Sequence, residues 1–295
     1  MQATQEAISK SKIFISTSGV KSQRIGDAVR TLANAGFTKI ELSGGTNFYL
    51  DWYDDLKVLK KEFNLSYRLH NYFPPPEEHF VLNLASSDPR HLELSRLMIQ
   101  EAIRFSSELG STMYGFHAGF LVDAKVSELG NKINVRSQVD REKAVNQFIE
   151  NYSALSLEAE KVGVSVYVEN NVLSERNFIS FGGQNLLMLC DSDEYSSLNQ
   201  QTRLNLLLDI AHLKVSAQTL GKSFREEAAR LWSESSYLHI SDNDGTRDSN
   251  EPVGLNSEMY RVIKEFGLKD KEVTLEIYGS LEGMQKTFEN MLEIL

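Results

Sequence analysis

The sequence predicts a single (β/α)8 TIM barrel over residues 1–295, and three observations support this fold class. Eight short apolar runs rich in β-forming residues recur along the chain, as expected for strands that are buried on both faces. Amphipathic stretches with helical periodicity separate many of these runs, and Gly36, Gly110, Gly163 and Gly267 follow where a helix should end. Eight β/α units in this length average about 37 residues each, which suits the fold.

Each expected element follows from one of these patterns. The strands are expected, in chain order, at Ile13–Ser16, Lys39–Leu42, Leu65–His70, Thr112–His117, Val164–Glu169, Leu204–Asp209, Tyr237–Ile240 and Glu272–Ile277. The helices with the clearest periodicity are Arg24–Ala35, Arg90–Leu109, Arg141–Val162, Met259–Phe266 and Leu281–Leu295. We interpret the apolar run Asn185–Cys190 as one face of a buried helix. A doubly wound open sheet is the alternative fold, but Ser43–Thr46 (SGGT) matches no dinucleotide or phosphate-loop fingerprint.

Composition narrows the class of partner. The chain has 31 Lys and Arg against 41 Asp and Glu, a net charge of −10, which disfavours nucleic acid or an anionic membrane as the main partner. Its single cysteine, Cys190, excludes an intrachain disulfide. Met1–Lys12 lacks the apolar segment of a signal peptide, and no stretch reaches the roughly 18 apolar residues of a membrane span. We therefore expect a cytoplasmic protein with no membrane partner.

Polar side chains end most of the predicted strands. A TIM barrel gathers its functional residues at the carboxyl ends of its strands, so these side chains should meet at one mouth. The residues at or just beyond these strand ends are His70, His117, Glu169, Asp209, His212, His239, Arg247 and Glu276.

Three of these residues, Glu169, Asp209 and Glu276, pose the same electrostatic problem. A carboxylate at the end of a buried strand costs several kcal/mol unless its charge is compensated. Arg247 and Lys214 are the cationic residues nearest to these strand ends in the sequence, and two are too few to compensate three carboxylates. A divalent cation would compensate all three carboxylates, with His239 as a nitrogen ligand. Without a metal, each residue could instead be a hydrogen-bonded structural group.

Four short motifs together resemble one known superfamily. They are VEN at Val168–Asn170, DIAH at Asp209–His212, HISDNDG at His239–Gly245 and LEI at Leu275–Ile277. Their order and spacing resemble the xylose isomerase-like TIM barrels, which include sugar isomerases and epimerases and apurinic endonucleases of the endonuclease IV type. The resemblance covers nearly the whole chain.

The two branches of this superfamily imply different metal sites. The epimerase branch implies one metal held by Glu169, Asp209, His239 and Glu276, with His212 as a substrate contact. The endonuclease branch implies three zinc ions, the first of them held by His70, His117 and Glu169. Its second ion uses the four residues of the epimerase site, and its third needs His212 with an Asp and a His after the seventh strand. Asn250 stands where that last His is expected, which disfavours the third ion.

We expect a metal-dependent sugar isomerase or epimerase. The substrate would be a small hydroxy-ketone or hydroxy-aldehyde, deprotonated next to a metal-chelated carbonyl to give an enediolate. Glu169 and Glu276 would serve as acid and base. The expected cofactor is one divalent cation, Mn²⁺ before Zn²⁺, Mg²⁺ or Co²⁺. The substrate contacts are expected from His70, His117, His212 and Arg247.

Other interpretations stay open. The pair His70 and His117 could hold a second metal, and the chain could then be a phosphodiester hydrolase with two or three zinc ions. It could also be a binding protein that retains the ligands without turnover. A homodimer is compatible with a barrel of this size. Aromatic residues are expected around the mouth, and they are Phe48, Tyr49, Trp52, Tyr72, Phe73, Phe116, Phe120, Phe178 and Phe181.

Overall fold

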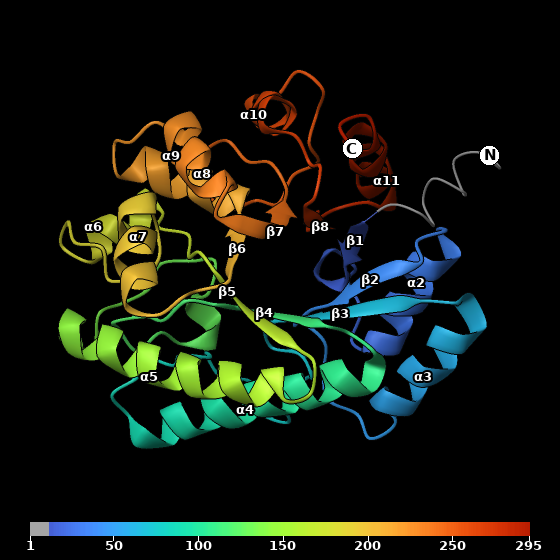
Figure 1. Cartoon of the computed structure of the whole chain (residues 1–295), viewed down its shortest axis with the longest axis horizontal. Helices are drawn as coiled ribbons and strands as arrows, with labels where there is room; N and C mark the ends of the chain where they lie inside the picture. Colours follow the sequence, from blue (N-terminus) through green and yellow to red (C-terminus); the bar gives the residue numbers. More distant parts are fainter. Residues whose placement is uncertain (1–11) are drawn as a thin grey trace.

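The computed structural model describes residues 12–295, in which eight parallel strands close into a barrel (Figure 1). Neighbours along the chain pair with each other, and β8 returns to pair with β1. The strands are β1 Ile13–Ser16, β2 Lys39–Leu42, β3 Ser66–His70, β4 Met113–His117, β5 Ser165–Glu169, β6 Leu206–Asp209, β7 Ser235–Ile240 and β8 Glu272–Leu275. The predicted barrel is confirmed over this range. Residues 1–11 of the predicted domain, with most of Met1–Lys12, lie outside the described residues.

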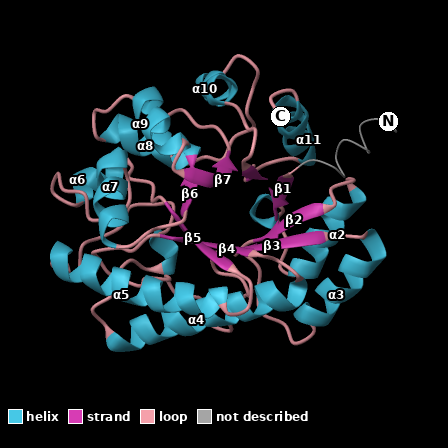
Figure 2. Cartoon of the chain, in the orientation of Figure 1, coloured by secondary structure: helices cyan, strands magenta, loops and turns pink. Residues whose placement is uncertain are grey.

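Helices surround the barrel on the outside (Figure 2). The α-helices are α2 Ile25–Asn34, α3 Trp52–Phe63, α4 Pro89–Leu109, α5 Arg141–Glu160, α6 Glu175–Ser180, α7 Ser192–Gln201, α8 Ile210–Thr219, α9 Phe224–Trp232, α10 Glu258–Phe266 and α11 Leu281–Leu292. Two short 3-10 turns, η1 Thr17–Gly19 and η2 Val126–Glu128, complete the order. None of the helices in residues 12–295 is both long and apolar enough to cross a membrane.

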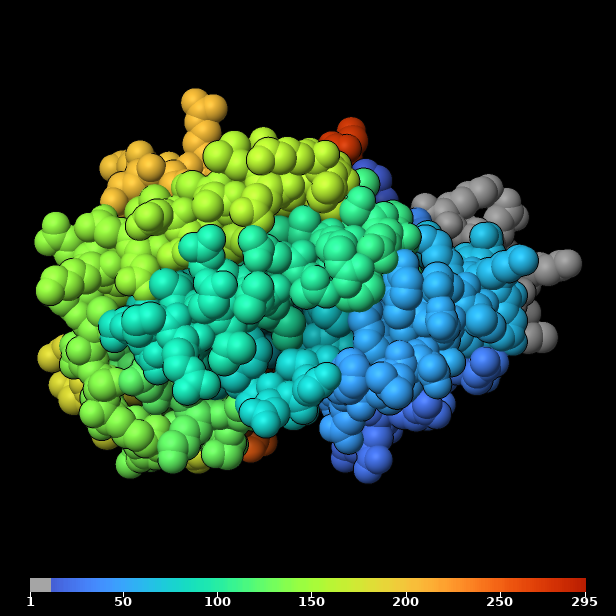
Figure 3. All heavy atoms as spheres, turned by 90° about the horizontal axis from the view of Figure 1, so that it is seen from below, coloured from blue at the N-terminus to red at the C-terminus, as the bar shows by residue number. Residues whose placement is uncertain are grey.

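The long helices α4 and α5 show how local sequence sets these elements. Asp88 caps α4 by accepting hydrogen bonds from the backbone N–H groups of Arg90 and His91, and Pro89 occupies the first turn. The helix ends at Gly110, whose φ of 76° is the left-handed conformation that glycine adopts without strain. Together with α3, these two helices form one continuous outer face of the molecule (Figure 3).

One predicted element is wrong. Asn185–Cys190 is buried but irregular, and Leu189 has a φ of 61°. Its backbone bonds to distant segments: the N–H of Met188 donates to the carbonyl of Gly119, and that of Asn171 donates to the carbonyl of Leu189. In an apolar run this short, periodicity cannot distinguish a buried helix from a buried extended segment.

The barrel interior is polar, whereas such barrels are usually filled by branched apolar side chains. Arg68 of β3 forms an ion pair with Glu272 of β8 at 2.8 Å. Above it, Glu41 of β2 accepts hydrogen bonds from Tyr237 of β7 and Thr274 of β8. The main apolar core therefore lies between the strands and the helices, and only a small cluster around Met113, Leu207 and Tyr237 lies apart from it.

Gly115 of β4 generates a stability prediction. A Cβ atom at this position would lie 2.8 Å from Leu207 Cδ2 and 3.0 Å from His70 Cδ2. We therefore expect Gly115→Ala to lower the free energy of unfolding by about 1–3 kcal/mol, measured by urea denaturation followed by circular dichroism. Gly254→Ala is the control, because a Cβ there meets nothing within 4 Å. Equal denaturation midpoints for the two variants would contradict the prediction.

Candidate metal centre

Four strand ends bring the predicted ligand set together. Glu169 ends β5, Asp209 ends β6, His239 lies in β7 and Glu276 directly follows β8. One ligand atom from each of the four lies within 4.8 Å of the others. Strand β8 stops at Leu275, earlier than expected, but the N–H of Glu276 still donates to the carbonyl of Ile240 and keeps the glutamate in register.

The ligand atoms of this cluster are short of partners. His239 Nδ1 lies 3.1 Å from Glu169 Oε1 and 3.2 Å from Glu276 Oε2. Three buried atoms, Glu169 Oε1, Asp209 Oδ2 and His239 Nδ1, have no hydrogen-bond partner among the described residues. Buried polar atoms without partners are rare in proteins, and here they converge. Carboxylate oxygens with one imidazole nitrogen fit a divalent cation.

Asp209 shows how the fold presents a free oxygen to this cluster. Its Oδ1 atom accepts the N–H of His212 at 2.7 Å and so caps helix α8. The side chain of Asn170 bonds to both backbone groups of Asp209. With its backbone fixed and one oxygen committed to the cap, the aspartate keeps Oδ2 for a ligand.

A second group of possible ligands shares Glu169. His70 Nε2 lies 2.8 Å and His117 Nδ1 lies 3.3 Å from Glu169 Oε2. One ligand atom from each of these three residues lies within 4.8 Å of the others. These three residues, which include His70 and His117, are therefore close enough together to share a metal ion.

The position that the endonuclease branch implies for a third zinc ion is built differently. His212 donates from Nδ1 to the carbonyl of Asn170 at 2.9 Å, and its Nε2 lies 3.3 Å from Asp248 Oδ2. The amide of Asn250 accepts from Ser241 and donates to Asp248. Both ends of the Asn250 side chain are thus engaged in hydrogen bonds, which disfavours this residue as a metal ligand.

Burial and charge shift the pKa values in this centre in opposite directions. Burial alone would raise the pKa of Glu169, but His117, His70 and His239 hold it well below its usual range. Burial raises the pKa of Asp209 to about 7. The pKa of His239 is raised: burial opposes the charged form, and Glu41 and Tyr237 outweigh it. Burial lowers the pKa of His117 to about 4. Asp209 and His239 therefore hold protons below neutral pH that a cation bound here would displace.

Sequence analysis missed Glu41, which lies fully buried beneath this centre with its carboxylate 3.1 Å from His239 Nε2. The signal was available, because Glu41 is a glutamate inside the apolar strand KIEL, as Glu169 is in its own strand. It also missed Arg68, whose charge is taken up by Glu272. Lys214, one of the two cationic residues nearest to these carboxylates in the sequence, forms an ion pair with Asp242.

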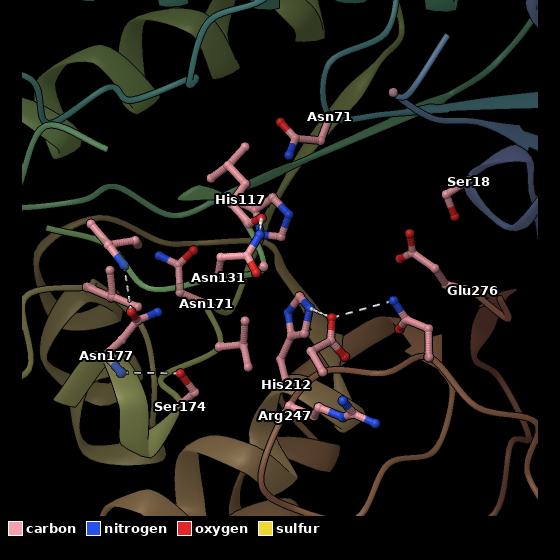
Figure 4. Close-up of a pocket in the computed structure, with 18 of the residues that line it drawn as sticks. Ser18, Asn71, His117, Asn131, Asn171, Ser174, Asn177, His212, Arg247 and Glu276 are labelled. Atoms are coloured by element: carbon pink, nitrogen blue, oxygen red, sulfur yellow. Dashed lines mark hydrogen bonds and ion pairs between the residues drawn. The ribbon is translucent and has the colours of Figure 1, made fainter. Parts of the chain in front are cut away.

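A cavity of about 860 Å³ lies above the centre, which is a volume typical of small-molecule sites. His70, His117, His212, Arg247 and Glu276 line it, whereas Glu169, Asp209 and His239 lie deeper. Asn131, Asn171, Ser174 and Asn177 gather on one side, while Ser18 and Glu276 lie opposite them (Figure 4).

The aromatic residues expected at the mouth divide into two groups. Tyr72 and Phe120 line the cavity. The other seven do not line it. Trp52, Phe73, Phe116 and Phe181 are buried in the apolar core, where Trp52 contacts Phe73 edge to face at 5.3 Å. Tyr49 and Phe178 pack against this core, and Phe48 is exposed.

Solved structures share this architecture at low sequence identity. A D-tagatose 3-epimerase-like protein superposes with a TM-score of 0.69 at 16% identity, covering 96% of this chain and 99% of its own. A 3-keto-D-glucoside 4-epimerase from E. coli gives 0.66 at 12% identity, covering 97% and 99%. An AP endonuclease of family 2 from Brucella melitensis gives 0.65 at 18% identity, covering 94% and 97%. These similarities establish the fold.

The sequence itself gives the family. The model of the xylose isomerase-like TIM barrel matches residues 29–294, which include all four residues of the cluster and both histidines beside it. This chain therefore belongs to the xylose isomerase-like TIM-barrel family.

Proposed function

We propose that this protein is a metal-dependent isomerase or epimerase of a small sugar or sugar derivative. The observation that carries the proposal is the convergence of three unpartnered buried atoms, from Glu169, Asp209 and His239, directly beneath a cavity of small-molecule size. The similarity in fold to proteins named as sugar epimerases supports it.

One divalent cation would be held by Glu169, Asp209, His239 and Glu276, and Mn²⁺ is the first choice for three carboxylates and one imidazole. When bound, the cation supplies a Lewis acid that polarises a substrate carbonyl and orients the neighbouring hydroxyl. Zn²⁺, Mg²⁺ and Co²⁺ are the alternatives.

Glu276 and Glu169 are proposed to move the proton. Glu276 reaches the cavity wall, and the pKa of its carboxyl is lowered, because His239 outweighs the opposing effect of burial. The pKa of Glu169 is lowered as well, so both side chains are bases at neutral pH. Because they lie at the ends of different strands, one can take the proton from the carbon next to the carbonyl while the other returns it.

The cavity walls suit a polyhydroxylated substrate. Amide and hydroxyl side chains such as Asn71, Asn131 and Ser18 can bind sugar hydroxyls, and Tyr72 and Phe120 offer apolar surface to a sugar ring. We propose that His70, His117 and His212 bind substrate oxygens near the centre. Arg247 lines the wall without an ion pair in the described part of the chain and would bind an oxygen at the far end of the substrate.

A metal-dependent phosphodiester hydrolase is the second candidate. The group of His70, His117 and Glu169 favours it, because it offers the geometry of another metal site. The hydrogen bonds of Asn250 and the net charge of −10 weigh against it.

The first prediction concerns metal content. Elemental analysis of gently purified protein should give one equivalent of divalent metal per chain, lost in Glu276→Gln because a carboxylate ligand is removed. The exposed Glu282→Gln is the matched control and should keep its metal. Two or three equivalents of zinc in the unaltered protein would instead support the hydrolase.

The second prediction concerns pH. Asp209 has a pKa raised to about 7 and His239 a raised pKa, so both hold protons below neutrality that a cation must displace. Mn²⁺ affinity should therefore increase by at least about tenfold from pH 6 to pH 8, measured by calorimetric titration. Affinity independent of pH over this range would disprove the assignment of these ligands.

The third prediction concerns the chemical step. Incubation of ketoses and aldoses with the protein and Mn²⁺ in deuterated water should exchange the hydrogen next to the carbonyl, detected by NMR. Glu276→Gln should slow this exchange by at least about 10²-fold, because it removes both a general base and one of the proposed metal ligands. Glu282→Gln should exchange at the unaltered rate. Exchange that survives unchanged in Glu276→Gln would remove Glu276 from the mechanism.

A further inference from the structure

Glu41 is a buried carboxylate on the side of the His239 ring that faces away from the candidate metal centre. It lies in β2 and is 0% exposed. Its Oε2 atom accepts hydrogen bonds from the hydroxyl of Tyr237 and from Thr274 Oγ1, the latter at 2.8 Å. Its Oε1 atom has no such partner and lies 3.1 Å from His239 Nε2. A carboxylate this deeply buried needs its charge compensated, and the imidazole of His239 lies close enough to do so.

The two nitrogens of His239 face different environments. Nδ1 faces Glu169 Oε1 and Glu276 Oε2 at 3.1 and 3.2 Å, whereas Nε2 faces Glu41. An imidazole that binds a metal through one nitrogen carries its proton on the other, and an acceptor at that proton fixes both tautomer and ring orientation. We propose that Glu41 is the positioning residue that holds the His239 proton on Nε2, so that the Nδ1 lone pair faces the cation.

Neither Arg68 nor Tyr237 replaces Glu41 as the acceptor of the His239 Nε2 proton. Arg68, the buried guanidinium below it, pairs with Glu272 at 2.8 Å and stacks over the rings of Phe14 and Tyr237. Tyr237 Oη lies 3.3 Å from His239 Nε2, but its proton is already donated to Glu41. Among residues 12–295 the tyrosine is therefore the competing acceptor at Nε2, and a variant can separate its contribution.

Glu41→Gln tests this role directly, because the hydrogen bonds around position 41 fix the orientation of the new amide. Tyr237 and Thr274 both donate to Oε2, so the amide oxygen stays there and its NH2 group turns toward His239. A donor at Nε2 drives the ring proton onto Nδ1, where it blocks the metal. The matched control is Tyr237→Phe, which removes a hydroxyl from the same network and leaves Glu41 in place.

The inference rests on the cation centre proposed above, and the experiment separates the two. Mn²⁺ dissociation constants are measured on the full chain by the EPR signal of free Mn²⁺. We expect Glu41→Gln to bind about 10–100-fold more weakly than the unaltered chain, and Tyr237→Phe to bind equally well. The role of Glu41 is overturned if Glu41→Gln binds Mn²⁺ as tightly as the unaltered chain. It is also overturned if Tyr237→Phe is the only variant that binds Mn²⁺ more weakly. Absence of binding by the unaltered chain overturns the centre itself.

A second measurement needs no variant and therefore does not depend on whether Glu41→Gln folds. The Zn²⁺-loaded chain labelled with ¹⁵N-histidine should show His239 protonated at Nε2 with Nδ1 bound to the metal. A spectrum with the proton on Nδ1 overturns the inference, even if zinc binds.

Discussion

The carboxylate of Glu169 is fully buried and shared by His70, His117 and His239. An unpaired carboxylate at this depth would be severely destabilising, so each imidazole has to be held at hydrogen-bonding distance by its own strand. The register of β3, β4, β5 and β7 is therefore tied to one side chain. The same arrangement still leaves Oε1 without a hydrogen bond, so the imidazoles alone do not satisfy the site.

The interior of the barrel below this carboxylate is filled by two groups of polar side chains. Arg68 and Glu272 form one group, and Glu41 with Tyr237 and Thr274 forms the other. Each group takes its residues from strands that are distant in sequence. Apolar packing between strands and helices provides the stability that the polar interior does not.

The part of this arrangement that was predictable from the sequence is the part set by local pattern. Strand ends such as Glu169 are marked by an apolar run that stops at a polar residue, so their common mouth followed from the fold class. Glu41 was overlooked because it lies inside its strand and not at the end, so the rule that selected Glu169 did not apply to it. Asn185–Cys190 was assigned to a helix because its backbone partners, such as Gly119, are far away in the chain. The cavity side chains Asn131 and Asn177 lie on such long-range segments as well.

One side of the cavity wall is made by the two loops that follow β4 and β5, and hydrogen bonds join these loops to each other. The N–H of Ile133 donates to Asn177 Oδ1 at 2.9 Å, Ser180 Oγ donates to the carbonyl of Ile133 at 2.7 Å, and Asn171 Nδ2 bridges the carbonyls of Ala118 and Met188. None of these contacts involves the charged cluster. During evolution the wall can therefore diverge to accept a new molecule while the chemistry below is inherited intact. The two loops must then change together, because an insertion in one alone would break its hydrogen bonds to the other.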